Sequence, residues 1–251
     1  INAFLRFCVN RLHYKNCWLP PDASTVQGEA YKKSRDGYPL TDQQIIRLLA
    51  WLEEHKTTVR DRRWRFAFQL CAVFGLRPED LQHLTTKRGG KELWSNYRKS
   101  KGGNSGDKTE PRRLYPLFVQ DSDGNVQNWN LIARFHIGEE LPPLNSVGNA
   151  GDAMRTYLRR QKIWDQLKAE ADAEGEQLVP YSFRHRYAYV AHTRQLPTGG
   201  YRAPKQIADA MGHDLATHEK HYARFATKNL ADVFDSEESP TASAVSKASR
   251  S

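Results

Sequence analysis

The sequence predicts a mainly α-helical domain that carries a small antiparallel β-hairpin, an α+β fold. Thr41 followed by Gln44 is the pattern of a capping box, and apolar residues recur at helical spacing after it. Between residues 91 and 118 this spacing is lost, and two strand-like segments flank a glycine-rich turn. Together these observations place a hairpin inside an otherwise helical chain.

The first 40 residues differ from the rest of the chain. Residues 1–17 predict one helix that is too short to bury its apolar face alone, and residues 19–40 are rich in Pro, Gly, Ser and charge without a period. We therefore expect a linker over 19–40 and a globular domain that begins at about residue 41. Because the chain begins at Ile1 and not at a methionine, we also expect further residues upstream.

The other helices are predicted from apolar spacing and from the residues at their ends. Gly75 ends one helix, Pro78 begins the next with Arg77 at its boundary, and Ser182 and Thr217 are the expected N-caps of two later helices. The predicted ranges are 59–74, a single long helix over 149–173, a helix from 182, 204–211, and a last helix that carries Tyr222. Residues 236–251 are rich in Ser, Ala, Thr and Glu, which predicts a disordered tail.

The hairpin is predicted from strands over 92–99 and 112–118, with glycines and small polar residues over 102–106. Its basic residues would contact a DNA backbone or groove, or they would form a solvated tip. They are Lys99, Lys101, Lys108, Arg112 and Arg113. The following segment 121–125 resembles the start of a calcium loop but lacks the required glutamate, so we interpret it as a turn.

The composition favours a nucleic-acid partner. Lys and Arg number 38 against 29 Asp and Glu, which gives a formal charge of +9 at pH 7. The three cysteines form no CxxC pair, and no apolar run reaches the ~20 residues of a membrane span. We therefore expect a cytoplasmic protein without disulfides, cysteine-bound metal or a membrane partner.

Three histidines near the C-terminal end of the chain could suggest a zinc site. His218 and His221 do not have the spacing of an HExxH motif, and no set of cysteines or carboxylates completes a tetrahedron with His213. We interpret His218 and His221 as residues on a helix surface.

Five features follow one another in a defined order. A tyrosine can form a covalent intermediate where neighbouring cations stabilise the charge that develops on a phosphate. The features are Arg77 with Asp80 three residues later, the lysine-bearing hairpin, Tyr181-x-x-Arg184, Gly212-His213, and Tyr222 nine residues after His213. In this order and spacing the chain resembles, over about 41–225, the catalytic domain of tyrosine recombinases, the phage-integrase family. The resemblance implies that family's fold and makes residues 1–40 the end of an upstream helical DNA-binding domain plus a linker.

The resemblance implies a role for each matching residue. Tyr222 would attack a backbone phosphorus to form a 3′-phosphotyrosyl ester, and a 5′-hydroxyl would leave. Arg77 and Arg184 would stabilise the non-bridging oxygens, because a guanidinium offers a planar fork of donors and stays charged. His213 would donate to one of those oxygens or help deprotonate Tyr222. Asp80 would orient Arg77 or the base.

A hairpin lysine would protonate the leaving 5′-oxygen, and two candidates exist. Lys108 lies eight residues before Pro116, which is similar to the family's usual spacing, whereas Lys101 would close the first strand with the glycine-rich turn as an insertion. We favour Lys108. The basic residues predicted to contact DNA are Lys99, Arg112, Arg113, His185 and Arg186.

Two features depart from the family pattern. The family usually has histidine where this chain has Tyr181, and a phenol can donate a hydrogen bond but cannot share a proton near neutral pH as imidazole does. The loop between Arg184 and His213 also looks longer than usual, which alters DNA contacts more than the chemistry.

The sequence therefore predicts a site-specific recombinase that breaks and rejoins double-stranded DNA. The ester conserves the bond energy, so no ATP, metal or other cofactor is expected. Relaxation of DNA as by a type IB topoisomerase, and a non-catalytic DNA-binding module of the same fold, are the alternatives. The resemblance also implies a homotetramer on paired sites. Residues 229–234 would then either be passed to a neighbouring protomer or pack in cis. It further implies a nucleoid-associated protein of a prokaryote, phage or mobile element.

Overall fold

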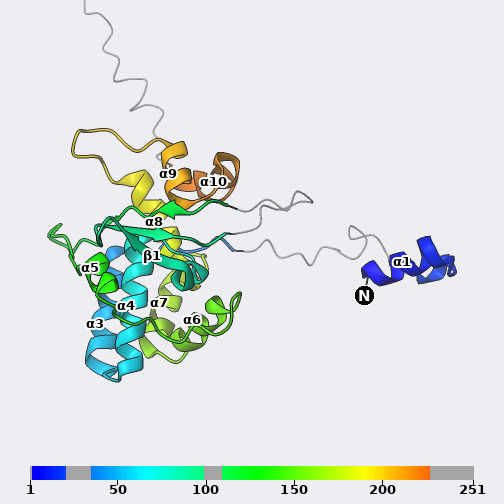
Figure 1. Ribbon diagram of the computed structural model, residues 1–251, viewed down its shortest axis with the longest axis horizontal. Coiled ribbons are helices and arrows are strands. Elements are labelled where there is room, and N and C mark those ends of the chain that lie inside the picture. Colours follow the sequence, from blue (N-terminus) through cyan, green and yellow to red (C-terminus); the bar gives the residue numbers. More distant parts are fainter. Residues whose placement is uncertain (1, 21–34, 99–108, 227–251) are drawn as a thin grey trace, which may run out of the picture. The chain divides into compact units, whose positions relative to one another are not determined.

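The computed structural model describes residues 2–20, 35–98 and 109–226 and divides into two compact units, 1–36 and 37–251 (Figure 1). Unit 1 contains α1 (Asn2–Leu12) and a short 3-10 helix, η1 (Asn16–Trp18). The predicted helix over 1–17 is therefore interrupted after Leu12, where His13 adopts a left-handed φ of 55°. Predictions that concern Lys99, Lys101, Lys108, residues 229–234 and the tail 236–251 lie outside the described residues.

Unit 2 confirms the predicted fold class, because it is mainly helical with one small antiparallel sheet. Figure 1 shows α3, α4, α6 and α7 at one end of this unit and α9 and α10 at the other. The helices are α3 (Asp42–His55), α4 (Val59–Phe74), η2 (Pro78–His83), α5 (Leu131–His136), α6 (Ala150–Leu158), α7 (Lys162–Ala173), α8 (Ser182–Thr193), α9 (Pro204–Met211), α10 (Leu215–Tyr222) and η3 (Ala223–Phe225). Within the described parts of the chain, no helix is long and apolar enough to cross a membrane.

The first two helices of unit 2 begin and end as predicted. Thr41 Oγ1 accepts from the amide of Gln44 at 3.1 Å, and the Gln44 side chain accepts from the amide of Thr41 at 2.9 Å, so the capping box is confirmed. Gly75 ends α4 with a left-handed φ of 61°, and a Cβ on this residue would lie 2.4 Å from Cγ of Tyr187. Both the backbone conformation and the close approach of Tyr187 therefore require glycine there.

The sheet has three strands in the order β1-β2-β3, namely β1 (Leu84–Lys87), β2 (Glu92–Ser95) and β3 (Arg112–Arg113). The predicted strands over 92–99 and 112–118 are thus too long, and β1 was not predicted. After Arg113 the Leu114 amide still donates to the Leu93 carbonyl of β2 at 2.9 Å, and the chain then turns to the core, where the buried Leu117 donates its amide to the Val73 carbonyl at 2.8 Å. The turn predicted over 121–125 is confirmed, since the Gly124 amide donates to the Asp121 carbonyl.

The long helix predicted over 149–173 is two helices, α6 and α7. The break falls at Arg159–Gln161, where the Gln161 backbone is extended. The Gln161 side-chain amide donates to the Tyr157 carbonyl at 2.9 Å, and its backbone amide donates to Leu158 instead. The side chain therefore replaces the backbone donor that would continue the helix.

Two predicted N-caps are wrong. Ser182 is the first residue of α8, and its hydroxyl accepts from the amide of Val179 at 3.1 Å, outside the helix. Thr217 lies inside α10, and the cap is Asp214, whose carboxylate accepts from the Thr217 amide at 2.7 Å. Both errors move the start of a helix by only a few residues.

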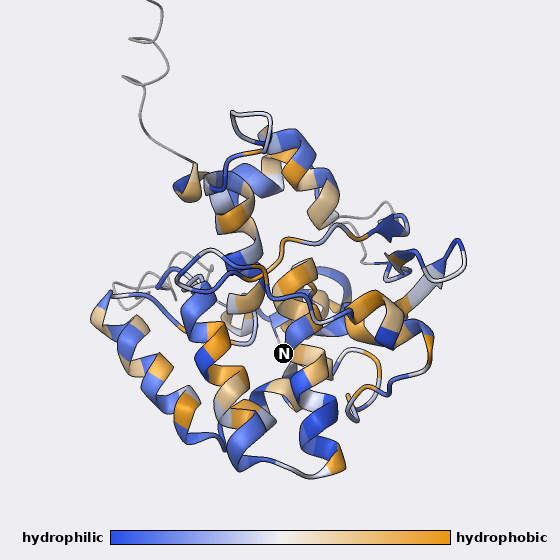
Figure 2. Cartoon of the chain, turned by 90° about the vertical axis from the view of Figure 1, so that its left-hand side faces the viewer, coloured by the Kyte–Doolittle hydropathy of each residue, from blue (hydrophilic) through white to orange (hydrophobic). Residues whose placement is uncertain are grey.

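Among the residues that the structure describes, the core of unit 2 consists of two hydrophobic clusters that share α8. The larger cluster is centred on α4, where Phe68 stacks on Phe183 of α8 at 5.5 Å between ring centroids. The smaller cluster joins α8 to α9, α10 and η3, and it contains Met211 and Tyr222. In Figure 2 hydrophobic and hydrophilic residues alternate along the helices, as expected for helices with one buried face. α8 therefore links the main core to the element that carries Tyr222.

Candidate active site

Four of the predicted catalytic residues line one cleft of about 890 Å³ in unit 2: Arg77, Tyr181, His213 and Tyr222. Arg184 lies in the protein interior beside them and is fully buried. These residues come from four separate parts of the sequence, at the starts or ends of η2, α8, α9 and α10. The other described residues of the cleft are Thr109, Glu110, His185, Lys205, Asp209, Gly212, Asp214, Thr217 and His221.

Arg184 is held between the ends of two helices. Its Nη1 donates to the Gly75 carbonyl at 2.7 Å, just beyond α4, and its Nη2 donates to the Met211 carbonyl, the last residue of α9. Helix C-termini carry partial negative charge, so these carbonyls stabilise a buried cation. Burial lowers the pKa of Arg184, but its interactions with Tyr181, Tyr222 and Asp80 outweigh this and raise it. The guanidinium therefore keeps its charge for an anion in the cleft.

Arg77 reaches the same place from the start of η2. Its Nη2 donates to the Gly212 carbonyl at 3.2 Å, and its backbone amide donates to Asp80 Oδ2 at 2.8 Å. Burial, followed by the positive charge of Arg184, lowers the pKa of Arg77 below its ordinary value. Two guanidinium groups that repel one another in this way favour a shared anion between them.

Asp80 is the buried acceptor that orients this part of the cleft. Besides the Arg77 amide, it accepts from Ser95 Oγ at 2.6 Å and from both Nη atoms of Arg112 at 3.2 and 3.0 Å. Burial alone would raise the pKa of Asp80, but the charges and hydrogen bonds of Arg112, together with Arg77, lower it to about 2. The carboxylate therefore fixes the backbone of Arg77 and is fully saturated as an acceptor.

The lowered pKa of Asp80 predicts a dependence of stability on pH. A carboxyl group with a folded pKa of about 2, against 3.8 when unperturbed, stabilises the fold above pH 3.8, and this contribution is lost as the pH falls towards 2. The expected loss of unfolding free energy is roughly 2 kcal/mol for this group. Denaturant unfolding between pH 5 and 2 measures it, and the Asp80→Asn variant should show a correspondingly smaller slope over this window. An unchanged slope would contradict the assignment.

The two phenols of the cleft lie together. Tyr222, the last residue of α10, is 3% exposed and interacts with the side chains of Arg184 and Tyr181. Burial raises the pKa of Tyr222, although Arg184 opposes this. For Tyr181 burial also acts to raise the pKa, but the charges of Arg184 and Arg77 outweigh it and lower the pKa below 10.0. Both hydroxyl groups are thus beside the arginines, and without a base Tyr222 is protonated at neutral pH.

His213 follows the glycine that ends α9. Gly212 has a left-handed φ of 69°, which favours glycine, and a Cβ there would also lie 2.8 Å from Cδ of Arg112. Burial, Arg184 and His218 lower the pKa of His213 to about 2. The imidazole is therefore neutral at neutral pH and has one donor and one acceptor nitrogen.

The interpretation of His218 as a surface residue is wrong. This histidine is only 1% exposed, and its Nδ1 lies 2.9 Å from Nε2 of His213. It is buried because α10 turns this face towards α8. His221, in contrast, is exposed at the rim of the cleft. Within the described residues there is no group of three His, Cys, Asp or Glu side chains that could hold a metal ion.

The residues predicted to contact DNA have different placements. Arg113 is 43% exposed in its side chain and pairs with Glu92 at 3.0 Å, so it lies on the surface. Arg112 is turned inward to Asp80. Arg186 is fully buried, where it pairs with Asp42 and donates to three main-chain carbonyls, those of Ala72, Leu117 and Phe118. Arg186 stabilises the core and has no exposed donor for a DNA phosphate.

His185 was expected only as a DNA contact, but it lies in the cleft. Its ring is 5.4 Å from that of Tyr181 and 5.7 Å from that of Tyr222, measured between centroids. Lys205 also lines the cleft from α9, where it pairs with Asp209. Because His185 is next to Arg184 in the sequence, its place in the cleft could have been predicted. No signal near Lys205 in the sequence indicated that this residue lines the cleft.

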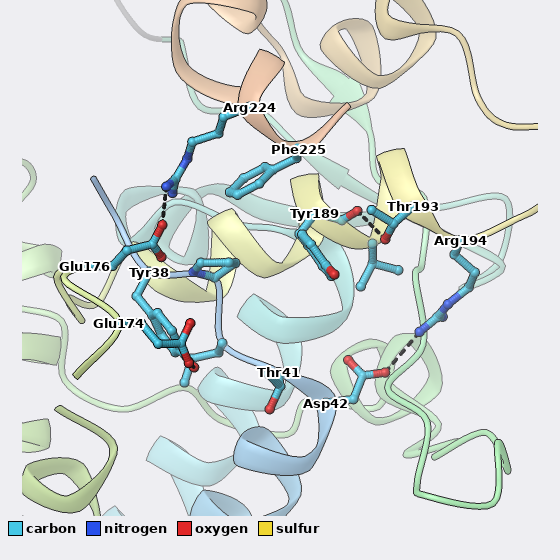
Figure 3. Close-up of a pocket in the computed structure, with 13 residues that line it drawn as sticks. Tyr38, Thr41, Asp42, Glu174, Glu176, Tyr189, Thr193, Arg194, Arg224 and Phe225 are labelled. Carbon is cyan, nitrogen blue, oxygen red and sulfur yellow. Dashed lines mark hydrogen bonds and ion pairs between the residues drawn. The ribbon is translucent and has the colours of Figure 1, made fainter. Parts of the chain in front are cut away.

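A second pocket, of about 630 Å³, is lined by residues at the start of unit 2 and by Arg224 and Phe225 (Figure 3). Arg224, two residues after Tyr222, donates to the Gly37 carbonyl and forms an ion pair with Glu176. Phe225 is buried against Tyr189 at 5.6 Å between ring centroids. The backbone that follows Tyr222 is thus fixed to the same unit that carries the arginines.

Comparisons with known proteins give one distant relative. The chain is 23% identical over 206 residues to Excisase A of Nostoc sp. (strain PCC 7120 / SAG 25.82 / UTEX 2576), an alignment that covers 76% of this chain and 39% of that protein. The chain thus spans about two fifths of the length of the curated relative it matches. No family model matches the chain, and no solved structure matches it. The comparison therefore establishes a distant similarity to a protein named for excision.

Proposed function

We propose that this chain is the catalytic domain of a site-specific DNA recombinase that acts through a 3′-phosphotyrosyl intermediate on Tyr222. The observation that carries the proposal is that Arg77, His213 and Tyr222, from distant parts of the sequence, line one cleft, with the buried Arg184 beside Tyr222. The distant similarity to Excisase A supports a role in site-specific recombination.

The proposed mechanism follows from the chemistry of these side chains. Tyr222 Oη forms a bond to a backbone phosphorus while the bond from phosphorus to the 5′-oxygen breaks. Arg77 and Arg184 stabilise the negative charge of the pentacoordinate transition state. Neutral His213 accepts the phenol proton, and a lysine protonates the leaving 5′-oxygen. Religation reverses these steps.

A basic wall next to the cleft supports double-stranded DNA as the substrate. A pocket of about 810 Å³ adjoins Arg77 and Tyr181 and is lined further on by Arg155, Arg159 and Lys168. Glu79 and Asp152 line it too, but three cations close to Arg77 suit the phosphates of a DNA backbone. Assembly as a homotetramer on paired sites is part of the proposal.

A nicking assay on supercoiled DNA tests for catalysis, and a two-site recombination assay separates a recombinase from a type IB topoisomerase. We expect a covalent protein–DNA adduct whose modified peptide, mapped by mass spectrometry, contains Tyr222. DNA binding without any adduct would favour the non-catalytic binding module instead. Relaxation of DNA without exchange between two sites would favour the topoisomerase.

The general acid is tested with a substrate in which sulfur replaces the bridging 5′-oxygen. A thiolate leaves without a proton, so this substrate should rescue cleavage only in the Lys→Ala variant of the true acid. We expect rescue for Lys108→Ala, and rescue for Lys101→Ala alone would show that the other hairpin lysine is the acid. If neither variant is rescued, Lys205→Ala is next, because Lys205 is the lysine that lines the cleft within the described residues.

A further inference from the structure

Three histidines form a continuous hydrogen-bonded row that begins in the candidate active site. His213 Nε2 lies 2.9 Å from His218 Nδ1, and His218 Nε2 lies 2.8 Å from His192 Nε2. The rings of His218 and His192 are stacked, with centroids 5.0 Å apart and an angle of 28° between their planes. His192 belongs to α8 and is 6% exposed. The row thus leads from the cleft into the interface between α10 and α8.

The geometry couples the protons of the three rings. A neutral imidazole has one N–H donor and one acceptor nitrogen, so each ring that donates on one side accepts on the other. If His213 Nε2 donates to His218, then His218 Nε2 donates to His192, and His213 Nδ1 is an acceptor. If every bond is reversed, His213 Nδ1 becomes a donor. Because Nε2 is occupied by His218, Nδ1 is the nitrogen of His213 left for Tyr222 or a phosphate.

The charges around the row differ along its length. His213 is surrounded by Arg184, His218, Arg77 and Asp214, and the two arginines oppose a positive charge on its ring. On His218 burial is the largest effect, followed by His192 and Arg184, and its pKa is lowered to about 4. The pKa of His192 is lowered by burial. The arginines therefore oppose the proton taken from Tyr222 least when it lies on His192, at the end of the row away from the cleft.

We propose that His218 and His192 form a proton relay that lets His213 act as a base towards Tyr222 without holding a positive charge beside the arginines. This inference rests on the proposed function. In the cleavage step the Tyr222 proton moves to His213 Nδ1, the His213 Nε2 proton to His218 Nδ1, and the His218 Nε2 proton to His192 Nε2. His192 becomes an imidazolium while the Tyr222 oxygen bonds to phosphorus, and the leaving 5′-oxygen takes its proton from the lysine. Religation returns each proton.

The first experiment does not depend on activity. Ring ¹⁵N chemical shifts of histidine-labelled protein report which nitrogen of each imidazole carries the proton. Replacing His192 by glutamine or phenylalanine changes the partner of His218, so the relay predicts a change in the tautomer of His213, one ring further on. Unchanged ¹⁵N shifts of His213 in both variants would overturn the coupling, whatever the protein does to DNA.

The second experiment measures single-turnover cleavage of a nicked suicide substrate. The glutamine of His192→Gln can hold the hydrogen bond to His218 but cannot take up a proton. The relay therefore predicts that His192→Gln and His192→Phe both slow cleavage about tenfold or more. A purely structural role predicts that His192→Gln cleaves at the wild-type rate, which overturns the relay. His55→Gln, at an exposed histidine of α3, serves as the control.

A fluorinated nucleophile separates proton transfer from packing. With 3,5-difluorotyrosine at position 222 the phenol is more acidic and needs less help from a base. The relay predicts that the tenfold difference between His192→Gln and wild type shrinks to about twofold with this residue, and a difference that stays tenfold overturns it. Failure of the wild type to form any adduct would refute the proposed function and would leave the ¹⁵N result as the independent measure of the row.

Discussion

Tyr222→Phe is expected to abolish the covalent adduct on a nicked suicide substrate, because the phenol oxygen is the atom that bonds to phosphorus. The experiment is discriminating here because Tyr181 lies beside Tyr222, near the same arginines, and has the lower pKa of the two. Tyr181→Phe should retain the adduct at a reduced rate, since it removes a hydrogen-bonding group and not the nucleophile. Denaturing gels of the trapped complex measure both.

The control for these variants is Tyr189→Phe. Tyr189 is also on α8, but it is 46% exposed and is not part of the cleft, so this variant should behave as wild type. An adduct that persists in Tyr222→Phe and disappears in Tyr181→Phe would move the nucleophile to position 181. The nine-residue spacing from His213 would then have no catalytic meaning.

Arg77→Ala and Arg184→Ala should each lower the cleavage rate about a hundredfold, or ~3 kcal/mol, because each removes a charged donor from the developing oxyanion. Their effects on stability should differ. Arg184→Ala also leaves the carbonyls of Gly75 and Met211 without their buried donor, which costs about 1–3 kcal/mol for each group. Single-turnover kinetics measure the cleavage rate, DNA-binding anisotropy measures the affinity for DNA, and thermal unfolding measures the stability.

The matched control is Arg155→Ala, at an exposed arginine of the adjoining basic wall. It should weaken DNA binding and lessen its salt dependence while it leaves the rate of the bound complex unchanged. If Arg77→Ala lost affinity and cleavage equally, Arg77 would be a backbone contact of the same kind as Arg155, and the transition-state role would be wrong.

The sequence correctly predicted helix ends that a few neighbouring residues determine. The capping box at Thr41 and the end of α4 at Gly75 were correct because a few neighbouring residues decide them. The break before α7 was missed because it depends on the side chain of Gln161, whose hydrogen bond to Tyr157 competes with the helix. The predicted strand over 112–118 was too long because the Leu117 amide pairs with Val73 of α4 and not with β2.

The candidate site shows the same division. The order and spacing of Arg77, Arg184, His213 and Tyr222 indicated residues that the structure places together. Burial could not be deduced in this way. Arg184 and Arg186 are both fully buried, yet Arg184 lies beside Tyr222 whereas Arg186 pairs with Asp42 and core carbonyls. His218 was taken for a surface residue because its partner His192 lies 26 positions away in the sequence.

The bond from Arg224 to the Gly37 carbonyl joins the first residue of unit 2 to a residue two positions before the end of its described part. Within the described residues, positions 37 and 224 of the unit therefore lie side by side. A tether attached before Gly37 and another attached after Ala226 start from neighbouring points, so their effective concentration towards a common target is set by their own lengths and not by the diameter of the fold. Lengthening either tether should therefore lower this effective concentration only gradually, roughly as the inverse three-halves power of the tether length.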